Sequence, residues 1–244
     1  MGALTAGFWG LVAGASLLVG AFLGLYTGAS QRIISIVMAI GAGVLISSVA
    51  FDLMDEAFKR GGFDATASGL VSGALIYFAA NWAVDHAGGQ HRKRSQGQQA
   101  GGSATAITIG ALLDGIPESA AIGISLIGGG AVGLVFVAAV FLSNVPEGLS
   151  AAAGMKKAGH STTYVLVLWG AVVVVSGLSA LLGYLFLAGA SGNVIAAIQS
   201  FAAGAIITML ASTMLPEAHE EGGSIVGVVT TLGFLVAFFL SRLE

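Results

Sequence analysis

Three carboxylates and one amide stand at helical spacing inside two apolar stretches of the chain. Asp114 and Glu118 are four residues apart, and Asn144 and Glu147 are three apart, so each pair projects from one face of a helix. A carboxylate in the core of a bilayer is costly if it stays unpaired. Neither stretch contains a basic residue. The negative charges must therefore be neutralised by protonation, by a distant partner or by a bound cation.

A proline lies beside each glutamate, as Pro117-Glu118 and Pro146-Glu147. Each proline removes a backbone donor and disturbs the carbonyl group one turn earlier, so we expect kinks that turn backbone oxygens toward the carboxylates. Oxygen-rich ligand sets suit divalent metals. Two alternatives stay open: packing kinks beside protonated acids, or a proton relay without metal. The predicted metal site consists of Asp114, Glu118, Asn144 and Glu147.

Further polar residues lie near the ends of apolar stretches, where charges reach water easily. The acidic cluster after Pro216 contains a histidine, and an aspartate marks the matching place in the first half. We expect these residues to guide metal and protons into or out of the site, with solvated helix ends as the alternative. This predicted relay consists of Asp52, Ser143, Glu217, His219 and Glu221.

The composition excludes an ordinary soluble domain. Hydrophobic residues make up 56% of the 244 residues and charged residues 9%, against about 25% charged in soluble domains. The absence of cysteine excludes thiolate metal sites and disulfides, and a net charge of −3 gives no reason to expect nucleic acid. No common hydrolase or ATPase motif is present, so we expect no enzyme, no cofactor and a lipid bilayer as the surroundings.

The apolar stretches predict an all-α polytopic membrane protein with eight transmembrane helices in one transport domain over 1–244. A bilayer core of about 30 Å needs about 20 apolar residues per helix. The polar, glycine- and glutamine-rich segment 87–103 predicts a flexible, solvated loop. The expected spans cover 3–28, 33–57, 65–86, 104–126, 131–153, 162–189, 193–217 and 223–241.

Two internal repeats relate the halves of the chain. Residues 43–62 align without gaps on 204–223, and 114–119 resemble 143–148 around the doubled Pro-Glu. Because the members of each pair lie five spans or one span apart, they cross the membrane in opposite directions. We therefore predict an inverted repeat, with spans 1–3 and 6–8 around a central antiparallel pair formed by spans 4 and 5.

The basic residues of the loops predict the orientation. Cytoplasmic loops carry an excess of Lys and Arg. Successive loops between the predicted spans lie on opposite sides of the membrane, and the loops on one side hold six such residues whereas the other side holds three. This favours both termini outside a cell membrane (inner or plasma) and segment 87–103 in the cytoplasm. The six are Arg32, Arg92, Lys93, Arg94, Lys156 and Lys157, and the three are Lys59, Arg60 and Arg242.

The paired Pro-Glu motifs on the fourth and fifth of eight spans resemble the ZIP family of zinc and iron transporters. The stretch from Met214 to Gly222 also resembles that family's motif on the seventh span. The family uses a His-Asn-x-Pro-Glu-Gly type motif on span four, where this chain has Asp114 in place of the histidine and Gly115 in place of the asparagine, while Glu118 matches. On span five, Ser143 replaces the first ligand, while Asn144, Glu147 and Gly148 match.

The resemblance implies uptake of a divalent cation into the cytoplasm by alternating access, without ATP and as a homodimer. Loss of the imidazoles leaves an all-oxygen site, which favours iron(II) or manganese over zinc, and we expect one bound metal as substrate. Uptake should weaken as pH falls, because the carboxylates must be deprotonated. The alternatives are a proton-coupled carrier of a small organic solute, or an intramembrane metal-dependent lipid-phosphate hydrolase, which would need a basic residue beside the acids.

Overall fold

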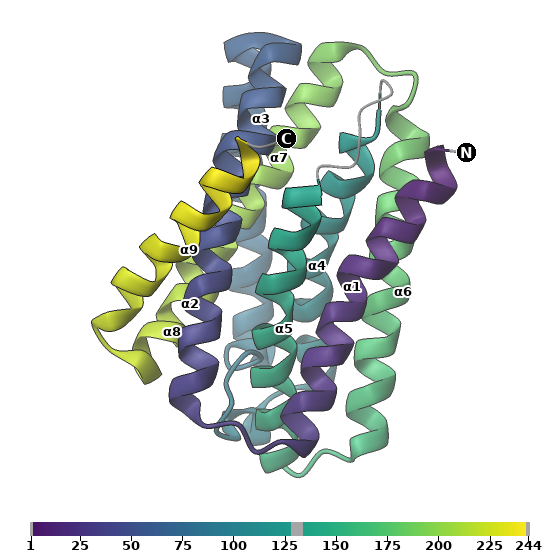
Figure 1. Cartoon of the computed structure of the whole chain (residues 1–244). Helices are drawn as coiled ribbons and strands as arrows, with labels where there is room; N and C mark the ends of the chain where they lie inside the picture. The colour runs from purple at the N-terminus through teal and green to yellow at the C-terminus, as the bar shows by residue number, and fades with distance from the viewer. Residues whose placement is uncertain (1, 128–133, 243–244) are drawn as a thin grey trace.

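The computed structural model describes residues 2–127 and 134–242, and all secondary structure among them is helical. Six continuous helical stretches in this part are long and apolar enough to cross a membrane, and Ile225–Ser241 is a shorter apolar helix. The chain is therefore a multi-pass helical membrane protein. The first three residues of the expected span 131–153 lie outside the described residues. The helices are α1 (Gly2–Tyr26), α2 (Gln31–Ser48), α3 (Asp55–Val84), α4 (Ala104–Ser125), α5 (Leu134–Lys157), α6 (Thr162–Leu187), α7 (Gly192–Met209), α8 (Leu215–Gly222) and α9 (Ile225–Ser241) (Figure 1).

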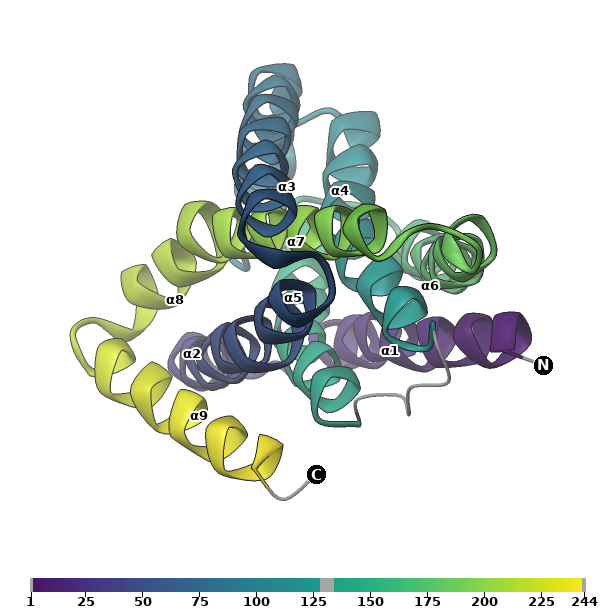
Figure 2. The ribbon, with the colours of Figure 1, turned by 90° about the horizontal axis from the view of Figure 1, so that it is seen from above.

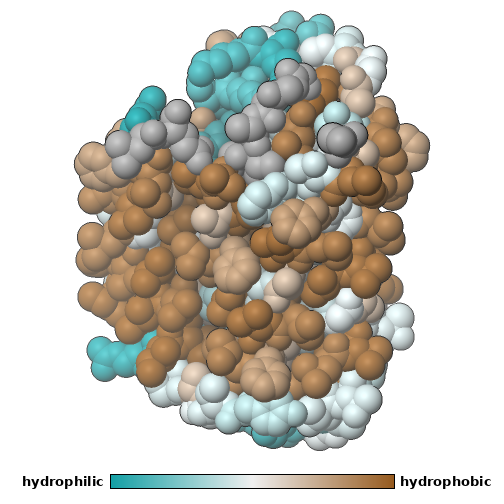
Figure 3. Space-filling model, turned by 45° about the vertical axis from the view of Figure 1, so that its right-hand side comes forward, coloured by the Kyte–Doolittle hydropathy of each residue, from teal (hydrophilic) through white to brown (hydrophobic). Residues whose placement is uncertain are grey.

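The outer surface is apolar around the middle of the molecule. Large hydrophobic side chains such as Phe78, Val167 and Phe186 are exposed, and Figure 3 shows a hydrophobic belt between two more polar ends. Lipid can cover such a belt, and helices satisfy their own backbone hydrogen bonds there. From above, α8 and α9 lie at one edge beside α2, and α6 lies at the opposite edge beside α1 and α4 (Figure 2).

Serine caps fix where three helices begin at one end of the bundle. Ser30, Ser103 and Ser161 accept hydrogen bonds from backbone amides at the starts of α2, α4 and α6, at 3.4, 3.4 and 3.2 Å. Such caps satisfy amides that have no partner within the helix. The start of α4 in turn sets the depth of Asp114, which lies about 15 Å along that helix, at 1.5 Å per residue.

Two long helical stretches turn back at glycines. The stretch Gln31–Gly89 has 59 residues and begins and ends at the same end of the bundle (Figure 1). It is interrupted at Gly62 (φ 70°, ψ −170°), and the chain turns in a similar way at Gly223 (φ 67°, ψ −157°) between α8 and α9. Glycine alone adopts such backbone angles readily. Both turns lie at the aligned ends of the sequence repeat.

The two repeats also share a helix irregularity. The π-helical segments η1 (Val49–Met54) and η4 (Leu210–Met214) begin at aligned positions after α2 and α7. The helices α2 and α7 run in opposite directions, and both chain termini lie at one end (Figure 1). Equivalent stretches of sequence therefore adopt equivalent backbone forms in opposite orientations.

Helix pairing follows the same pattern, since α2 packs on α9 and α3 packs on α7. Gly43 of α2 lies against the carbonyl of Thr230, and the aligned Gly204 of α7 lies against the carbonyl of Leu70. In each case a Cβ atom would overlap the facing backbone. Glycine lets transmembrane helices approach this closely, so both contacts depend on the missing side chain.

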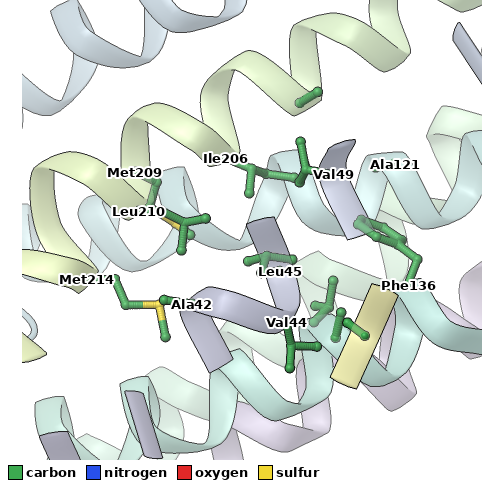
Figure 4. Close-up of a cluster of buried hydrophobic side chains, with 14 of the residues drawn as sticks. Ala42, Val44, Leu45, Val49, Ala121, Phe136, Ile206, Met209, Leu210 and Met214 are labelled. Carbon is green, nitrogen blue, oxygen red and sulfur yellow. The ribbon is translucent and has the colours of Figure 1, made fainter. Parts of the chain in front are cut away.

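An apolar cluster fills the bundle between α2, α5 and α7. Leu45, Val49, Phe136, Ile206 and Met209 are buried there and point toward one another (Figure 4). Ala121 of α4 belongs to the same cluster, one turn beyond Glu118 toward the end where the termini lie. The cluster therefore packs next to the carboxylate-bearing part of α4 on that side.

Candidate metal site between α4 and α5

Two of the predicted ligands converge on one cation. Asp114 of α4 and Glu147 of α5 are both buried, with 2% and 4% of their surfaces exposed. The Nζ atom of Lys93 lies 3.3 Å from Asp114 Oδ2 and 3.0 Å from Glu147 Oε2. The two carboxylates, from different helices, thus face a single positive charge at hydrogen-bonding distance. This lysine lies in the segment between α3 and α4.

Arg92 extends the charge network on the side of α3. Its Nε donates to Asp114 Oδ2 at 3.1 Å and its Nη2 donates to Asp114 Oδ1 at 3.2 Å. The same guanidinium donates to Asn81 Oδ1 at 2.6 Å and lies 3.2 Å from Asp85 Oδ1. The hydroxyl of Tyr77 donates to Asp114 Oδ1. Asp114 therefore has two cations and one hydroxyl as partners.

The electrostatics of Arg92 and Lys93 follow from this geometry. Burial alone would lower the pKa of each, because it disfavours the charged form. For Lys93, the carboxylates of Asp114 and Glu147 outweigh burial and raise the pKa above its ordinary value. For Arg92, Asp114 has the same effect and the pKa is raised. Both side chains are therefore cations at neutral pH.

The remaining predicted ligands lie beside this network. Glu118 is 1% exposed and Asn144 is 4% exposed, and their side chains are hydrogen-bond partners. Asn144 Nδ2 also lies 3.4 Å from the carbonyl of Ala13. The Oε1 atom of Glu118 is buried and has no hydrogen-bond partner among the described residues. A buried acceptor of this kind is available to a cation.

Little space remains at the site. A cavity of about 10 Å³ is lined by Arg92, Lys93, Asp114, Glu147 and Trp169, among others, which is room for about one water molecule. No group of three His, Asp or Glu side chains in the described part of the chain is placed to hold a metal ion. In this conformation the ammonium of Lys93 takes the position between the carboxylates.

The prediction of a solvated loop over 87–103 is wrong for its central residues. Arg92, Lys93, Ser95 and Gln99 are all buried, at 5% exposure or less. Sequence composition favours solvation here because the segment is polar. The buried carboxylates reverse that preference, since an unpaired charge inside the bundle costs more than burying a cation beside it.

Two residues of the predicted relay contact this segment. The hydroxyl of Ser150 on α5 is a hydrogen-bond partner of both the Lys93 carbonyl and the buried Glu217 carboxylate. Glu221 accepts a hydrogen bond from Gln96 Nε2 at 2.5 Å. Glu217 and Glu221 therefore hold the segment against α5 and α8.

The other three relay residues lie apart from these contacts. His219 is exposed on α8. Ser143 is buried on α5 and donates to the carbonyl of Val140 at 3.0 Å, within its own helix. Asp52 is half-buried on η1, which follows α2 toward the end of the bundle where the termini lie. The roles of these three residues stay predictions.

The sequence did not predict the positively charged residues of the site, Arg92 and Lys93. It also missed Tyr77 and Asn81, whose spacing on α3 places them on one face. The available signal was a charge mismatch, since two spans carry three acids without a base and the preceding segment carries Arg92, Lys93 and Arg94 in a row. Only the fold decides which of these bases enters the bundle.

Comparison with known proteins finds a distant relative. No family model matches the chain. A curated protein of Arabidopsis thaliana named as a putative zinc transporter is 25% identical over 185 residues, which are 75% of this chain and 29% of that protein. The chain thus spans less than a third of the length of this relative. It is a multi-pass membrane protein distantly related to a protein named as a zinc transporter, which confirms the resemblance that its Pro-Glu motifs indicate.

Proposed function

We propose that this protein transports a divalent metal cation across the membrane through a site between α4 and α5. The observation that carries the proposal is the position of the Lys93 ammonium, 3.3 Å from Asp114 and 3.0 Å from Glu147. Carboxylates from two helices converge there on one point of positive charge. Glu118 and Asn144 lie on the same two helices and add oxygen ligands to that set.

The charge balance of the site is negative, which favours a bound cation or protons. Four carboxylates, those of Asp85, Asp114, Glu118 and Glu147, surround the cations of Arg92 and Lys93. If all are ionised, the excess is two negative charges, since four minus two leaves two. One divalent ion, or two protons, would neutralise that excess. The donors are all oxygens, which suits manganese or iron(II), and also zinc with weaker preference.

With Lys93 in place, the size of the cavity disfavours the two alternatives. A space of about 10 Å³ admits a single ion or water, whereas an organic solute or a lipid phosphate needs far more room. The structure does supply the basic residues whose absence from spans 4 and 5 argues against a hydrolase. However, the donors of Arg92 and Lys93 are directed at carboxylates.

The shared backbone features of the repeats support alternating access. We infer eight crossings, because the stretches 31–89 and 192–241 each turn back at a glycine, Gly62 or Gly223. An inverted repeat can exchange the forms of its two halves and so open a central site to either side. The end that carries segment 90–103 is the basic one, so we assign it to the cytoplasm.

Metal uptake into proteoliposomes tests the proposal. Zn²⁺, Mn²⁺, Fe²⁺ and Cd²⁺ are compared for the wild type and for the double variant Glu118→Gln, Glu147→Gln, and uptake by the wild type should be saturable and abolished in this variant. The matched control is Asp55→Asn with Asp64→Asn, which removes two charges from exposed positions away from the site and should transport normally. Absence of uptake by a folded wild type for all four metals would refute the proposal.

A further inference from the structure

We propose that Lys93 is a built-in competitor of the transported cation, held in the site by the segment 90–99 and displaced when metal binds. This segment is called the basic strap below. The inference rests on the proposed function and names the regulation of the same site. In the empty carrier the Lys93 ammonium offsets part of the carboxylate charge and closes the site, and metal binding is coupled to withdrawal of the strap.

The first argument is that one position cannot hold two cations. The ammonium lies between Asp114 and Glu147 at 3.3 and 3.0 Å, which is where a metal bridging these carboxylates would lie. A metal at hydrogen-bonding distance from the ammonium would be strongly repelled in a buried site. Binding of the metal therefore requires that Lys93 moves away.

The second argument comes from the cavities on either side of the strap. Arg92 and Lys93 line the small cavity at the carboxylates, and they also line a cavity of about 60 Å³ on the side of α8. That second cavity is bounded by Arg94, Thr213 and Glu217, among others. The two basic side chains thus form the wall between them, and their withdrawal would join the site to the larger space.

The third argument is that the strap is held by contacts that can break. Its outer part is joined to α8 by the exposed Arg94–Glu220 ion pair and by the Gln96–Glu221 hydrogen bond. Partly exposed polar contacts of this kind contribute little stability. Glycines with left-handed backbone angles lie just before the strap, at Gly88 (φ 98°), and within its outer part, at Gly97 (φ 89°).

The charged side chains at the base of the strap are directed at the site itself. Arg92 faces Asp114, Asp85 and Asn81, and the Lys93 carbonyl faces Ser150. A divalent ion that neutralised Asp114 and Glu147 would remove most of the attraction that keeps Lys93 in place. Metal and strap therefore exclude each other through shared carboxylates.

Amine labelling of the unmodified protein tests the displacement directly. The chain has four lysines, of which Lys93 is buried and Lys59, Lys156 and Lys157 are exposed. Purified wild-type protein is treated with a water-soluble acylating reagent with and without Zn²⁺, and each lysine is quantified by peptide mass spectrometry. We expect Zn²⁺ to raise the acylation rate of Lys93 by about tenfold and to leave the rates of Lys59 and Lys157 unchanged.

The second test of the displacement is a measurement of Zn²⁺ binding by variants of the protein. The Zn²⁺ dissociation constant of Lys93→Gln should be lower than that of the wild type by about tenfold, because the competitor is gone. Lys157→Gln is the matched control, since it makes the same substitution at an exposed position at the same end of the bundle. Its dissociation constant should equal that of the wild type.

The outcomes separate this inference from the proposed function. If wild-type protein binds Zn²⁺, and Glu147→Gln weakens that binding, while Lys93 stays protected and Lys93→Gln binds with unchanged affinity, then the competitor idea is wrong and the metal site stands. The binding measurements are repeated with Mn²⁺, and if neither the wild type nor Lys93→Gln binds Zn²⁺ or Mn²⁺, both ideas fail. Should Lys93→Gln not fold, the labelling of the wild type decides alone.

Discussion

The ammonium of Lys93 lies 3.0 Å from Glu147 Oε2 inside the bundle, and Glu147 directly follows Pro146 within α5. Through this contact the protein itself compensates part of the negative charge of the buried site. A carboxylate cluster of this kind would otherwise depend on protons or on a bound cation. We therefore expect the protein to fold without a metal.

Metal removal should leave the wild-type fold intact. Because Lys93 and Arg92 neutralise Asp114, the melting temperature in detergent of protein purified without added metal should be the same with and without a chelator. Lys93→Gln should lower the unfolding free energy by about 3–5 kcal/mol in the presence of chelator, since a buried carboxylate loses its partner. A wild-type protein that melts much earlier with chelator would contradict this expectation.

Loss of the Tyr77 hydroxyl should destabilise the site without disrupting the packing of α3. Tyr77 is 2% exposed and donates to Asp114, and hydrogen bonds to charged groups contribute about 1.5–3 kcal/mol. Tyr77→Phe should reduce the unfolding free energy by that amount, as measured by denaturation in detergent. Tyr26→Phe, at a tyrosine with 60% exposure, is the control and should stay within about 0.5 kcal/mol of the wild type.

Equivalent glycines of the two repeats should be equally sensitive to an added methyl group. Gly43→Ala and Gly204→Ala each place a Cβ atom against a backbone carbonyl, of Thr230 and Leu70 respectively. Overpacking of this kind costs about 1–3 kcal/mol, so both variants should melt at lower temperature. In contrast, Gly227→Ala on α9 meets open space, and the melting temperature should stay the same or rise. Destabilisation by Gly43→Ala alone would show that the two halves do not pack alike.

The stabilising effect of Lys93 should be lost only at strongly alkaline pH. Burial would lower its pKa, but the carboxylates of Asp114 and Glu147 raise it above that of an unfolded lysine. A raised pKa gives stability that is fully present below the unfolded value and disappears as pH rises through the folded value. The difference in unfolding free energy between wild type and Lys93→Gln should be constant between about pH 7 and pH 9 and shrink above about pH 10.4. A difference that already declines by pH 9 would contradict this.

Metal uptake should weaken in mildly acidic solution. Protons compete with the metal for the carboxylate oxygens, so metal binding releases protons and loses affinity as pH falls. Initial rates of uptake into vesicles, measured at a fixed metal concentration across mildly acidic pH, should therefore decline. A flat profile would mean that the carboxylates of Glu118 and Glu147 are not the groups that bind the metal.

The sequence by itself determined the membrane class, the approximate limits of the helices and the carboxylate motifs. These follow from local properties, because about 20 apolar residues suffice for a span and because Asp114 and Glu118 share a helix face at a spacing of four. The internal repeat could also be recognised in the sequence. The structure shows that its aligned glycines, Gly62 and Gly223, adopt similar backbone angles. A backbone angle that excludes a side chain leaves glycine in the sequence, so such turns can be predicted locally.

Only the tertiary structure decided what neutralises the buried acids. Protonation, a distant partner and a bound cation are indistinguishable in the sequence, because each leaves the same residues on α4 and α5. The fold brings Arg92 and Lys93 into the bundle from a segment whose composition predicts solvation. Charge pairing in a medium that excludes water depends on distance in space, and that distance is fixed by how α3, α4 and α5 pack together.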